Sequence, residues 1–209
     1  MDGNKLTSLL ITQGKIYAYI STGLNEKGNQ RTIIIDNVNY NVNQKIYCSF
    51  KMLNNNKIKK ILFVCHGNIC RSPMAEFVMK DLVSKAGLDN QFYIESAATS
   101  TEEIGNEVYP PAKRKLAEHG IACKGKTARQ MTRNDYQRFD LLIGMDTRNL
   151  RNMNRICGGD PERKIHLLLD YTNRPGDVAD PWYTGNFEAT WRDVIEGCTM
   201  LLKDLTDRQ

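Results

Sequence analysis

The chain has 209 residues, of which 41% are hydrophobic, and its formal net charge is +5. That length fits one domain of ordinary size with a small addition, and no apolar run approaches the roughly 20 residues that cross a membrane. The six cysteines are scattered and form no Cys-x2-Cys pair or Cys/His cluster, which argues against a disulfide framework and a zinc site. We therefore expect a cytoplasmic protein without a signal peptide and without a metal.

The N-terminal part holds the excess positive charge. Residues 1–60 contain nine Lys/Arg and three Asp/Glu, a balance of +6, whereas residues 61–209 contain 20 and 21, a balance of −1. Basic strands with interleaved tyrosines would suit a polyanion such as single-stranded nucleic acid. An ordinary half-buried sheet with lysines at its rim is the interpretation that we favour.

Strand-like runs at 15–20, 31–36 and 45–51 are separated by turn signals. They predict a small β-meander. The run Asn54–Asn56 is typical of a linker, so we expect a β-rich segment over 1–56 and a second domain over 57–209.

Apolar strands alternate with amphipathic helices in the rest of the chain. The pattern predicts strands at 58–64, 92–96, 141–145 and 164–169 and helices at 74–85, 110–119, 132–139, 146–156 and 187–205. This rhythm predicts an α/β fold with a doubly wound, four-stranded parallel sheet and helices on both faces. Ligands of such sheets bind at the carboxyl ends of the strands.

The most informative segment is the loop Cys65-His-Gly-Asn-Ile-Cys-Arg71, which follows the first of these strands. The loop leads directly into a helix that Ser72-Pro73 opens, so successive backbone N–H groups can point at one anion. The same field favours a thiolate at Cys65, which is then a nucleophile. The planar fork of Arg71 can hold two phosphoryl oxygens, and Gly67 permits close backbone approach. The loop predicts a cysteine-based phosphatase.

The Cys-x5-Arg spacing also occurs at 123–129 and 157–163, but neither match follows a predicted strand. In the second match, Asp160 and Glu162 would repel phosphate and Pro161 removes a backbone donor. We therefore interpret both matches as coincidences.

A second phosphate-binding pattern competes with the cysteine loop. Residues 120–127 match Gly-x4-Gly-Lys-Thr, the phosphate loop of nucleotide hydrolases, and Asp146 could then be the magnesium ligand. That loop must leave a buried strand, whereas 110–119 has the pattern of a charged helix. Gly120 is then an ordinary helix C-terminal residue, and the cysteine loop remains the preferred interpretation.

A phosphatase of this kind needs a proton donor, because a phenolate leaves reluctantly unless it is protonated. Asp180 is the best candidate, since Trp182 and Tyr183 follow it and could flank a phenyl ring. The alternatives are Asp146, Asp170 and Asp177.

Over about residues 58–207, the chain resembles the low-molecular-weight protein-tyrosine phosphatases. The stretches that carry the resemblance are 64–76, 96–99, 144–146 and 180–183. The resemblance implies Cys65 as the nucleophile, Arg71 as the phosphate clamp and Asp180 as the general acid. We therefore expect a monomeric enzyme without cofactor or metal, which hydrolyses phosphotyrosine in proteins through a phosphocysteine intermediate and does not bind membranes.

The resemblance also implies supporting roles. Ser72 would hydrogen-bond the Cys65 thiolate, while Asn68 and Ser96 would hold the loop in shape. Cys70 would form a reversible disulfide with Cys65 under peroxide, with a small buried thiol as the alternative. The implied substrate-binding residues are His66, Gly67, Asn68, Ile69, Cys70, Ser72, Trp182 and Tyr183.

Smaller signs bear on the substrate. Ile69 and the Trp182-Tyr183 pair resemble the phosphotyrosine branch, since related arginine phosphatases carry threonine at the Ile69 position and lack the aromatic pair. Arsenate reductases with this fold resolve through a further cysteine pair, and Cys123 has no companion nearby.

Two departures from the family pattern stand out. Glu102 and Glu103 replace an aromatic wall, and would favour basic or reject acidic substrates. Lys126 replaces a histidine that many relatives carry ahead of Ala-Arg-Gln, which alters the network behind the loop.

Overall fold

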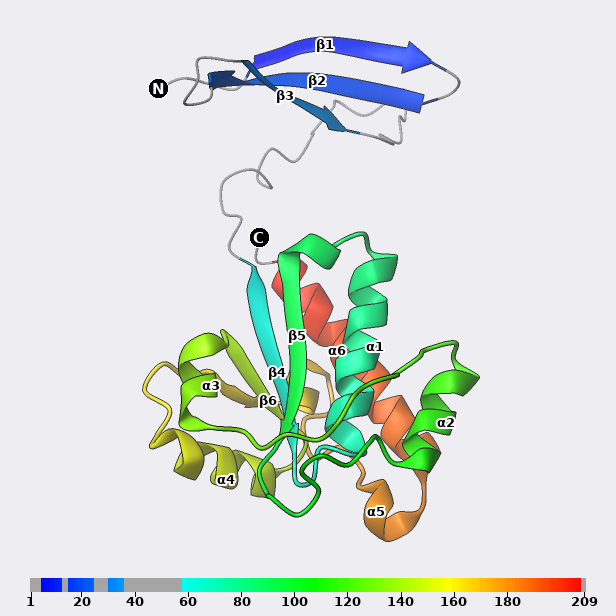
Figure 1. Cartoon of the computed structure of the whole chain (residues 1–209), viewed down its shortest axis with the longest axis vertical. Coiled ribbons are helices and arrows are strands. Elements are labelled where there is room, and N and C mark those ends of the chain that lie inside the picture. Colours follow the sequence, from blue (N-terminus) through cyan, green and yellow to red (C-terminus); the bar gives the residue numbers. More distant parts are fainter. Residues whose placement is uncertain (1–4, 13–14, 25–29, 36–57, 208–209) are drawn as a thin grey trace. The chain divides into compact units, whose positions relative to one another are not determined.

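The computed structural model describes residues 5–12, 15–24, 30–35 and 58–207. The chain divides into two compact units, Met1–Phe50 and Lys51–Gln209 (Figure 1). The predicted strand at 45–51 and the predicted linker at Asn54–Asn56 lie outside the described residues.

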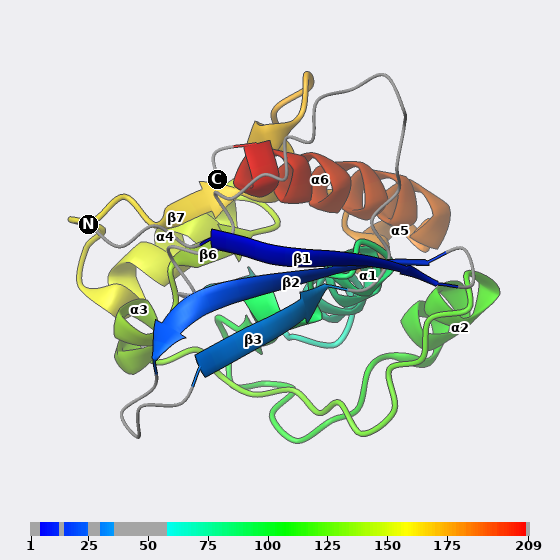
Figure 2. The ribbon, with the colours of Figure 1, turned by 90° about the horizontal axis from the view of Figure 1, so that it is seen from above.

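The first unit contains an antiparallel sheet in the order β1-β2-β3 (Figure 2). Its strands are β1 (Lys5–Thr12), β2 (Lys15–Leu24) and β3 (Gln30–Ile35). The last two overlap the predicted strands at 15–20 and 31–36, whereas β1 was not predicted. A register shift between Leu6 and Ser8 marks a bulge in β1, and a bulge interrupts the alternation by which a strand is recognised.

The second unit is built on a four-stranded sheet in the order β5-β4-β6-β7, and every pair of neighbouring strands is parallel. Its strands are β4 (Lys59–Cys65), β5 (Phe92–Ala98), β6 (Leu141–Gly144) and β7 (Ile165–Leu167). The predicted doubly wound parallel sheet is confirmed. Because β4 lies between β5 and β6, its carboxyl end faces loops on both sides.

Helices cover both faces of this sheet, as predicted (Figure 1). One face carries α1 (Arg71–Lys85), α2 (Pro110–Glu118) and α6 (Phe187–Asp207), and the other carries α3 (Arg133–Arg138) and α4 (Thr147–Cys157). The remaining elements are the short helix α5 (Pro181–Thr184) and two 3-10 helices, η2 (Asp89–Gln91) and η3 (Leu168–Tyr171).

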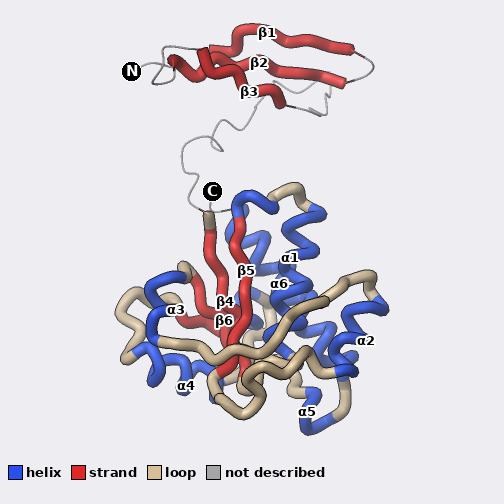
Figure 3. Tube along the Cα trace, in the orientation of Figure 1, coloured by secondary structure: helices blue, strands red, loops and turns tan. Residues whose placement is uncertain are grey.

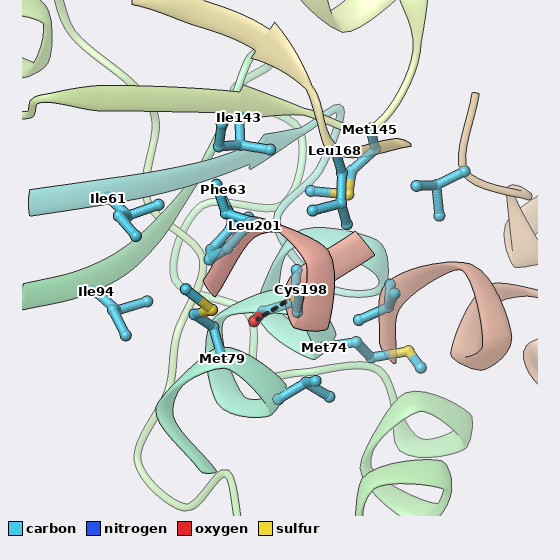
Figure 4. Packing of buried hydrophobic residues seen from close by; sticks show 14 of the residues in the cluster. Ile61, Phe63, Met74, Met79, Ile94, Ile143, Met145, Leu168, Cys198 and Leu201 are labelled. Atoms are coloured by element: carbon cyan, nitrogen blue, oxygen red, sulfur yellow. Dashed lines mark hydrogen bonds between the residues drawn. The ribbon is translucent and has the colours of Figure 1, made fainter. Parts of the chain in front are cut away.

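The central strand β4 is buried on both sides. Ile61 and Phe63 pack toward α1 and α6, whereas Leu62 and Val64 pack toward α3 and α4, and all four are fully buried. Figure 4 shows the first of these clusters, with strand residues facing the helices. Burial on both faces explains why the strand is a continuous apolar run. Within the described ranges, no helix has the length and apolar character that a bilayer crossing requires.

The prediction and the structure differ at two short elements, η3 and α5. The predicted strand at 164–169 is wrong beyond Leu167, because the chain turns there into η3, where the N–H of Leu167 donates to Asp170 Oδ2 at 3.1 Å. The candidate acid Asp180 is the N-cap residue of α5, a helix that the sequence analysis did not predict. A helix of four residues leaves no periodic pattern in the sequence.

Close packing of α6 on η3 predicts the effect of adding a methyl group there. A Cβ atom built at Gly197 would lie 2.5 Å from Cγ of the fully buried Leu168. We expect Gly197→Ala to lower the unfolding free energy by up to about 2 kcal/mol, because overpacking costs about 1–3 kcal/mol and the gain in helix propensity offsets only about 1 kcal/mol. Urea denaturation measures this change.

Two further variants make that test specific. Thr199→Ala, at an exposed position of the same helix, should change the unfolding free energy by less than about 0.5 kcal/mol. In a Leu168→Ala background, Gly197→Ala should be neutral or stabilising, because the clash is removed. An increase in stability for Gly197→Ala alone would contradict the packing described here.

Candidate active site

The loop that was predicted to bind phosphate begins at the carboxyl end of β4. Cys65 is the last residue of β4 and Arg71 is the first residue of α1, and the loops after β4, β5 and β6 gather at the same end of the sheet (Figure 3). A cavity of about 530 Å³ lies there. The predicted site residues that line it are Cys65, His66, Gly67, Ile69, Cys70, Arg71, Asp180, Trp182 and Tyr183.

The sulfur of Cys65 receives polar contacts from two directions. Its Sγ lies 3.0 Å from Ser72 Oγ and 3.3 Å from the backbone N of Asn68, and the residue is 3% exposed. Ser72 Oγ also accepts from Asn68 Nδ2 at 2.9 Å. The Ser72 hydroxyl can therefore donate its own proton to the sulfur or to the Ala97 carbonyl, which lies 3.4 Å away.

Asn68 connects the loop to its surroundings. It has φ of +58° and is fully buried. Its Nδ2 donates to Ser72 Oγ and to Ser96 Oγ at 2.8 Å, and its Oδ1 accepts from the backbone N of Arg129 at 3.2 Å. Asparagine tolerates the left-handed conformation better than most residues, so both its backbone and its side chain suit this position.

A carboxylate behind the loop extends this network. Ser96 Oγ donates to Glu76 Oε2 at 2.5 Å, and Lys126 Nζ lies 3.1 Å from the same oxygen and 3.0 Å from the Ser96 carbonyl. Lys80 contacts the other carboxylate oxygen. Sequence reasoning assigned no role to Glu76, although a glutamate among apolar positions of a helix is itself a signal, because a buried carboxylate needs partners.

These contacts overturn the nucleotide-loop interpretation of residues 120–127. The segment follows helix α2 and not a strand, and Gly120, with φ of +74°, ends that helix. The Lys126 amine is bound to Glu76 and to the Ser96 carbonyl, so it is not directed at a separate phosphate site.

Arg71 is held between two carboxylates. Its NH1 lies 2.7 Å from Asp146 Oδ2 and its NH2 lies 2.6 Å from Asp180 Oδ2, while the residue is 3% exposed. Burial by itself would lower the pKa of this guanidinium, but the negative charges of Cys65, Asp180 and Asp146 raise the pKa above its ordinary value. The group is a permanent cation in the floor of the cavity.

The alternative acids differ in what they contact. Asp146 Oδ1 accepts from Asn149 N at 2.6 Å and so caps α4, and Asp177 Oδ1 accepts from Thr147 N at 2.9 Å. Asp170 does not line the cavity. Asp180 lines the cavity, as Asp146 and Asp177 do; its Oδ2 contacts Arg71, and its Oδ1 accepts from the backbone N of Trp182 at 3.0 Å.

Aromatic side chains stand at the mouth of the cavity. Trp182 is 57% exposed and Tyr183 is 78% exposed. The ring centroid of Tyr109 lies 5.6 Å from that of Trp182, and the backbone N of Tyr109 donates to the Ile69 carbonyl at 2.8 Å. Sequence reasoning missed Tyr109, because it lies far from both the loop and α5 in the chain.

The other cysteines of the described region are buried and free. Burial and the neighbouring charges of Cys65 and Asp180 raise the pKa of Cys70 to about 12. Burial also raises the pKa of Cys157 to about 11 and that of Cys123 above its ordinary value. Neither Cys123 nor Cys157 lines the cavity, so the two additional Cys-x5-Arg matches form no part of it.

The comparison with protein families agrees with this geometry. The model of the family "Low molecular weight phosphotyrosine protein phosphatase" matches residues 60–209. The chain belongs to this family. It is 40% identical over 147 residues to the low molecular weight protein-tyrosine-phosphatase YfkJ of Bacillus subtilis, covering 69% of this chain and 94% of YfkJ. It is 39% identical over 152 residues to the phosphatase of Gallus gallus, covering 70% and 96%.

Solved structures show the same fold. The crystal structure of YfkJ matches with a TM-score of 0.71 at 38% identity, covering 73% of this chain and 97% of that one. A structure described as DARP, a Drosophila arginine phosphatase, matches with a TM-score of 0.65 at 32% identity, covering 70% and 97%. The similarity therefore extends over nearly the whole length of each relative.

The position of Asn68 gives a testable expectation. Asn68→Gly permits the positive φ but removes three hydrogen bonds, so we expect the unfolding free energy to fall by about 2–3 kcal/mol. Asn68→Ala should cost about 1 kcal/mol more, because alanine also strains the left-handed backbone. Denaturant unfolding measures both values.

Asn154→Ala is the matched control, because Asn154 is exposed on α4. It should leave stability within about 0.5 kcal/mol of the parent. If Asn68→Gly is as stable as the parent, the buried amide does not hold the loop.

Proposed function

We propose that the chain hydrolyses phosphotyrosine in proteins, without a metal ion, through a phosphocysteine intermediate. One observation carries the proposal. The Cys65 sulfur, which contacts Ser72 Oγ at 3.0 Å, the Arg71 guanidinium and the Asp180 carboxylate all line one cavity at the carboxyl end of β4. A nucleophile, an anion clamp and a proton donor are the groups that phosphoryl transfer of this type requires.

In the first step, Cys65 attacks phosphorus, the S–P bond forms and the P–O bond to the tyrosyl oxygen breaks. Asp180 gives its proton to that oxygen, so a neutral phenol leaves. Arg71 and the backbone N–H groups of the loop hold the other phosphoryl oxygens. Asp146, 2.7 Å from the guanidinium, keeps it in orientation when phosphate takes over the contact that Asp180 makes.

In the second step, the Asp180 carboxylate accepts a proton from water as the water attacks phosphorus. The S–P bond breaks, inorganic phosphate leaves and the Cys65 thiolate is regenerated. Ser72 stabilises this leaving group, because its hydroxyl can donate to the sulfur. The positive charge that a metal would supply comes from Arg71 and the loop.

Phosphotyrosine suits the mouth of the cavity, since the exposed Trp182 and Tyr183 rings offer apolar surface to a phenyl ring. Phosphoarginine is the competing substrate that the similarity to DARP raises. Ile69 lines the cavity and has no polar group to offer a guanidinium. On this proposal, the catalytic unit is residues 57–209, since every residue named here lies within it.

Hydrolysis of an aryl phosphate in excess chelator tests the mechanism. Cys65→Ser should lower kcat by at least about a thousandfold, because it removes the nucleophile, while inorganic phosphate still binds to the loop. Cys157→Ser, a buried cysteine outside the cavity, is the control and should keep its turnover. Normal turnover of the Cys65→Ser variant, or a requirement for magnesium, would refute the mechanism.

The role of Asp180 is tested by varying the leaving group. Asp180→Ala should slow phenyl phosphate by about 10²–10⁴-fold, because the phenolate then leaves without a proton. An ester with a strongly acidic phenol should slow far less. Asp177→Asn, which changes a neighbouring carboxylate of the same cavity, is the control. Any slowing that it causes should be the same for both esters. Equal slowing of both esters by Asp180→Ala would exclude Asp180 as the acid.

A further inference from the structure

The sheet order places two different loops on opposite sides of the Cys65 loop. Strand β5 pairs with one edge of β4 and β6 pairs with the other edge. The segment after β5 therefore borders one side of the cavity, and the segment after β6, which includes the start of α4, borders the opposite side. Both segments line the cavity that contains Cys65.

The side that follows β5 is acidic. Glu102 and Glu103 line the cavity, and residues 99–109 contain no lysine or arginine. Glu102 is exposed and its Oε2 lies 3.0 Å from His66 Nε2, while Glu103 accepts from Asn106 Nδ2 at 2.6 Å. No arginine or lysine of the described region forms an ion pair with either glutamate, so this rim presents negative charge to the cavity mouth.

The side that follows β6 is basic. Arg148 and Arg151 line the cavity from α4 and are exposed. Helix α4 contains no acidic residue, and no carboxylate of the described region forms an ion pair with either arginine. Arg148 is the second residue of α4, where the helix dipole disfavours a cation. A charged residue that is unfavourable for its own helix often lies at a functional site, where it can bind a ligand.

The carboxylates on the basic side have local contacts. Asp146 is bound to Arg71 and Asn149, and Asp177 accepts from Thr147 at the start of α4. On this side, the two arginines have no carboxylate partner in the described region, whereas one carboxylate, that of Asp177, has no guanidinium partner there. The basic side therefore carries an excess of positive charge. The mouth of the cavity is negative on one side of Cys65 and positive on the other.

We propose that this polarity selects the substrate: the site prefers phosphotyrosine segments with Lys/Arg on one side of the phosphotyrosine and Asp/Glu on the other side. Glu102 and Glu103 would receive the basic flank, and Arg148 and Arg151 would receive the acidic flank. The inference rests on the proposed function and deepens it, because it names specificity residues for the same site. A peptide bound across the mouth in an extended conformation would place the residues before and after phosphotyrosine on opposite sides of Cys65.

Two peptides of identical composition test this proposal. One has the order Lys-Lys-phosphotyrosine-Glu-Glu and the other has the order Glu-Glu-phosphotyrosine-Lys-Lys, and acetyl and amide groups block both ends. Net charge is the same, so only the order of the flanks differs. We expect the kcat/KM values to differ by about tenfold at low ionic strength and to converge in about 1 M salt, which screens exposed charges.

Charge-removing variants assign the effect to its residues. The pair Glu102→Gln with Glu103→Gln and the pair Arg148→Gln with Arg151→Gln should each reduce the ratio of the two peptides from about tenfold to about threefold. The matched controls are Glu107→Gln, in the same loop, and Arg155→Gln, on the same helix, neither of which lines the cavity. Both controls should keep the full ratio. Because each ratio is measured within one enzyme, changes in overall activity cancel.

The outcomes separate this proposal from the proposed function. Turnover of p-nitrophenyl phosphate with equal kcat/KM for the two peptides would overturn the flank preference alone. A ratio that differs from one but survives both pairs of substitutions would overturn the assignment to these rims. Absence of turnover for p-nitrophenyl phosphate and for both peptides would overturn the proposed function and this inference with it.

Discussion

The side-chain amide of Asn68 is fully buried and hydrogen-bonded to Ser72, to Ser96 and to the backbone of Arg129, and the shape of the Cys65 loop depends on these contacts. A buried amide that lost its partners would cost about 1–3 kcal/mol for each unsatisfied group. The loop is thus fixed against α1, β5 and the segment before α3 together. The Glu76–Lys126 ion pair extends this support, because it fixes the orientation of the Ser96 hydroxyl.

The parallel sheet determines which residues can meet at this loop. Since β4 is central, the segments that follow β5 and β6 must lie on either side of Cys65, however far apart they are in the chain. Asp146, which follows β6, therefore reaches Arg71 at 2.7 Å, and the start of α5 brings Asp180 to the same guanidinium at 2.6 Å. The same topology separates the acidic rim from the basic rim.

Local patterns in the sequence predicted the sheet, the large helices and the Cys65 loop, because strand-loop-helix transitions leave a signal within about 15 residues. Contacts between distant segments left no such signal. The pairing of Asp146 with Arg71, the burial of Glu76 against Lys126 and the approach of Tyr109 to Trp182 follow from tertiary structure. Helix α5 and η3 were missed for a different reason, because each is too short for a periodic pattern of hydrophobic residues to be visible.

Burial also raises the pKa of several thiols in the second unit. The pKa values of four cysteines are raised above their ordinary value, namely those of Cys70, Cys123, Cys157 and Cys198. These four remain thiols at neutral pH, and electrophiles such as iodoacetamide react with thiolates. Cys65 instead has a hydroxyl and a backbone N–H beside its sulfur. Alkylation at neutral pH would therefore leave the thiols of Cys70, Cys123, Cys157 and Cys198 largely unmodified.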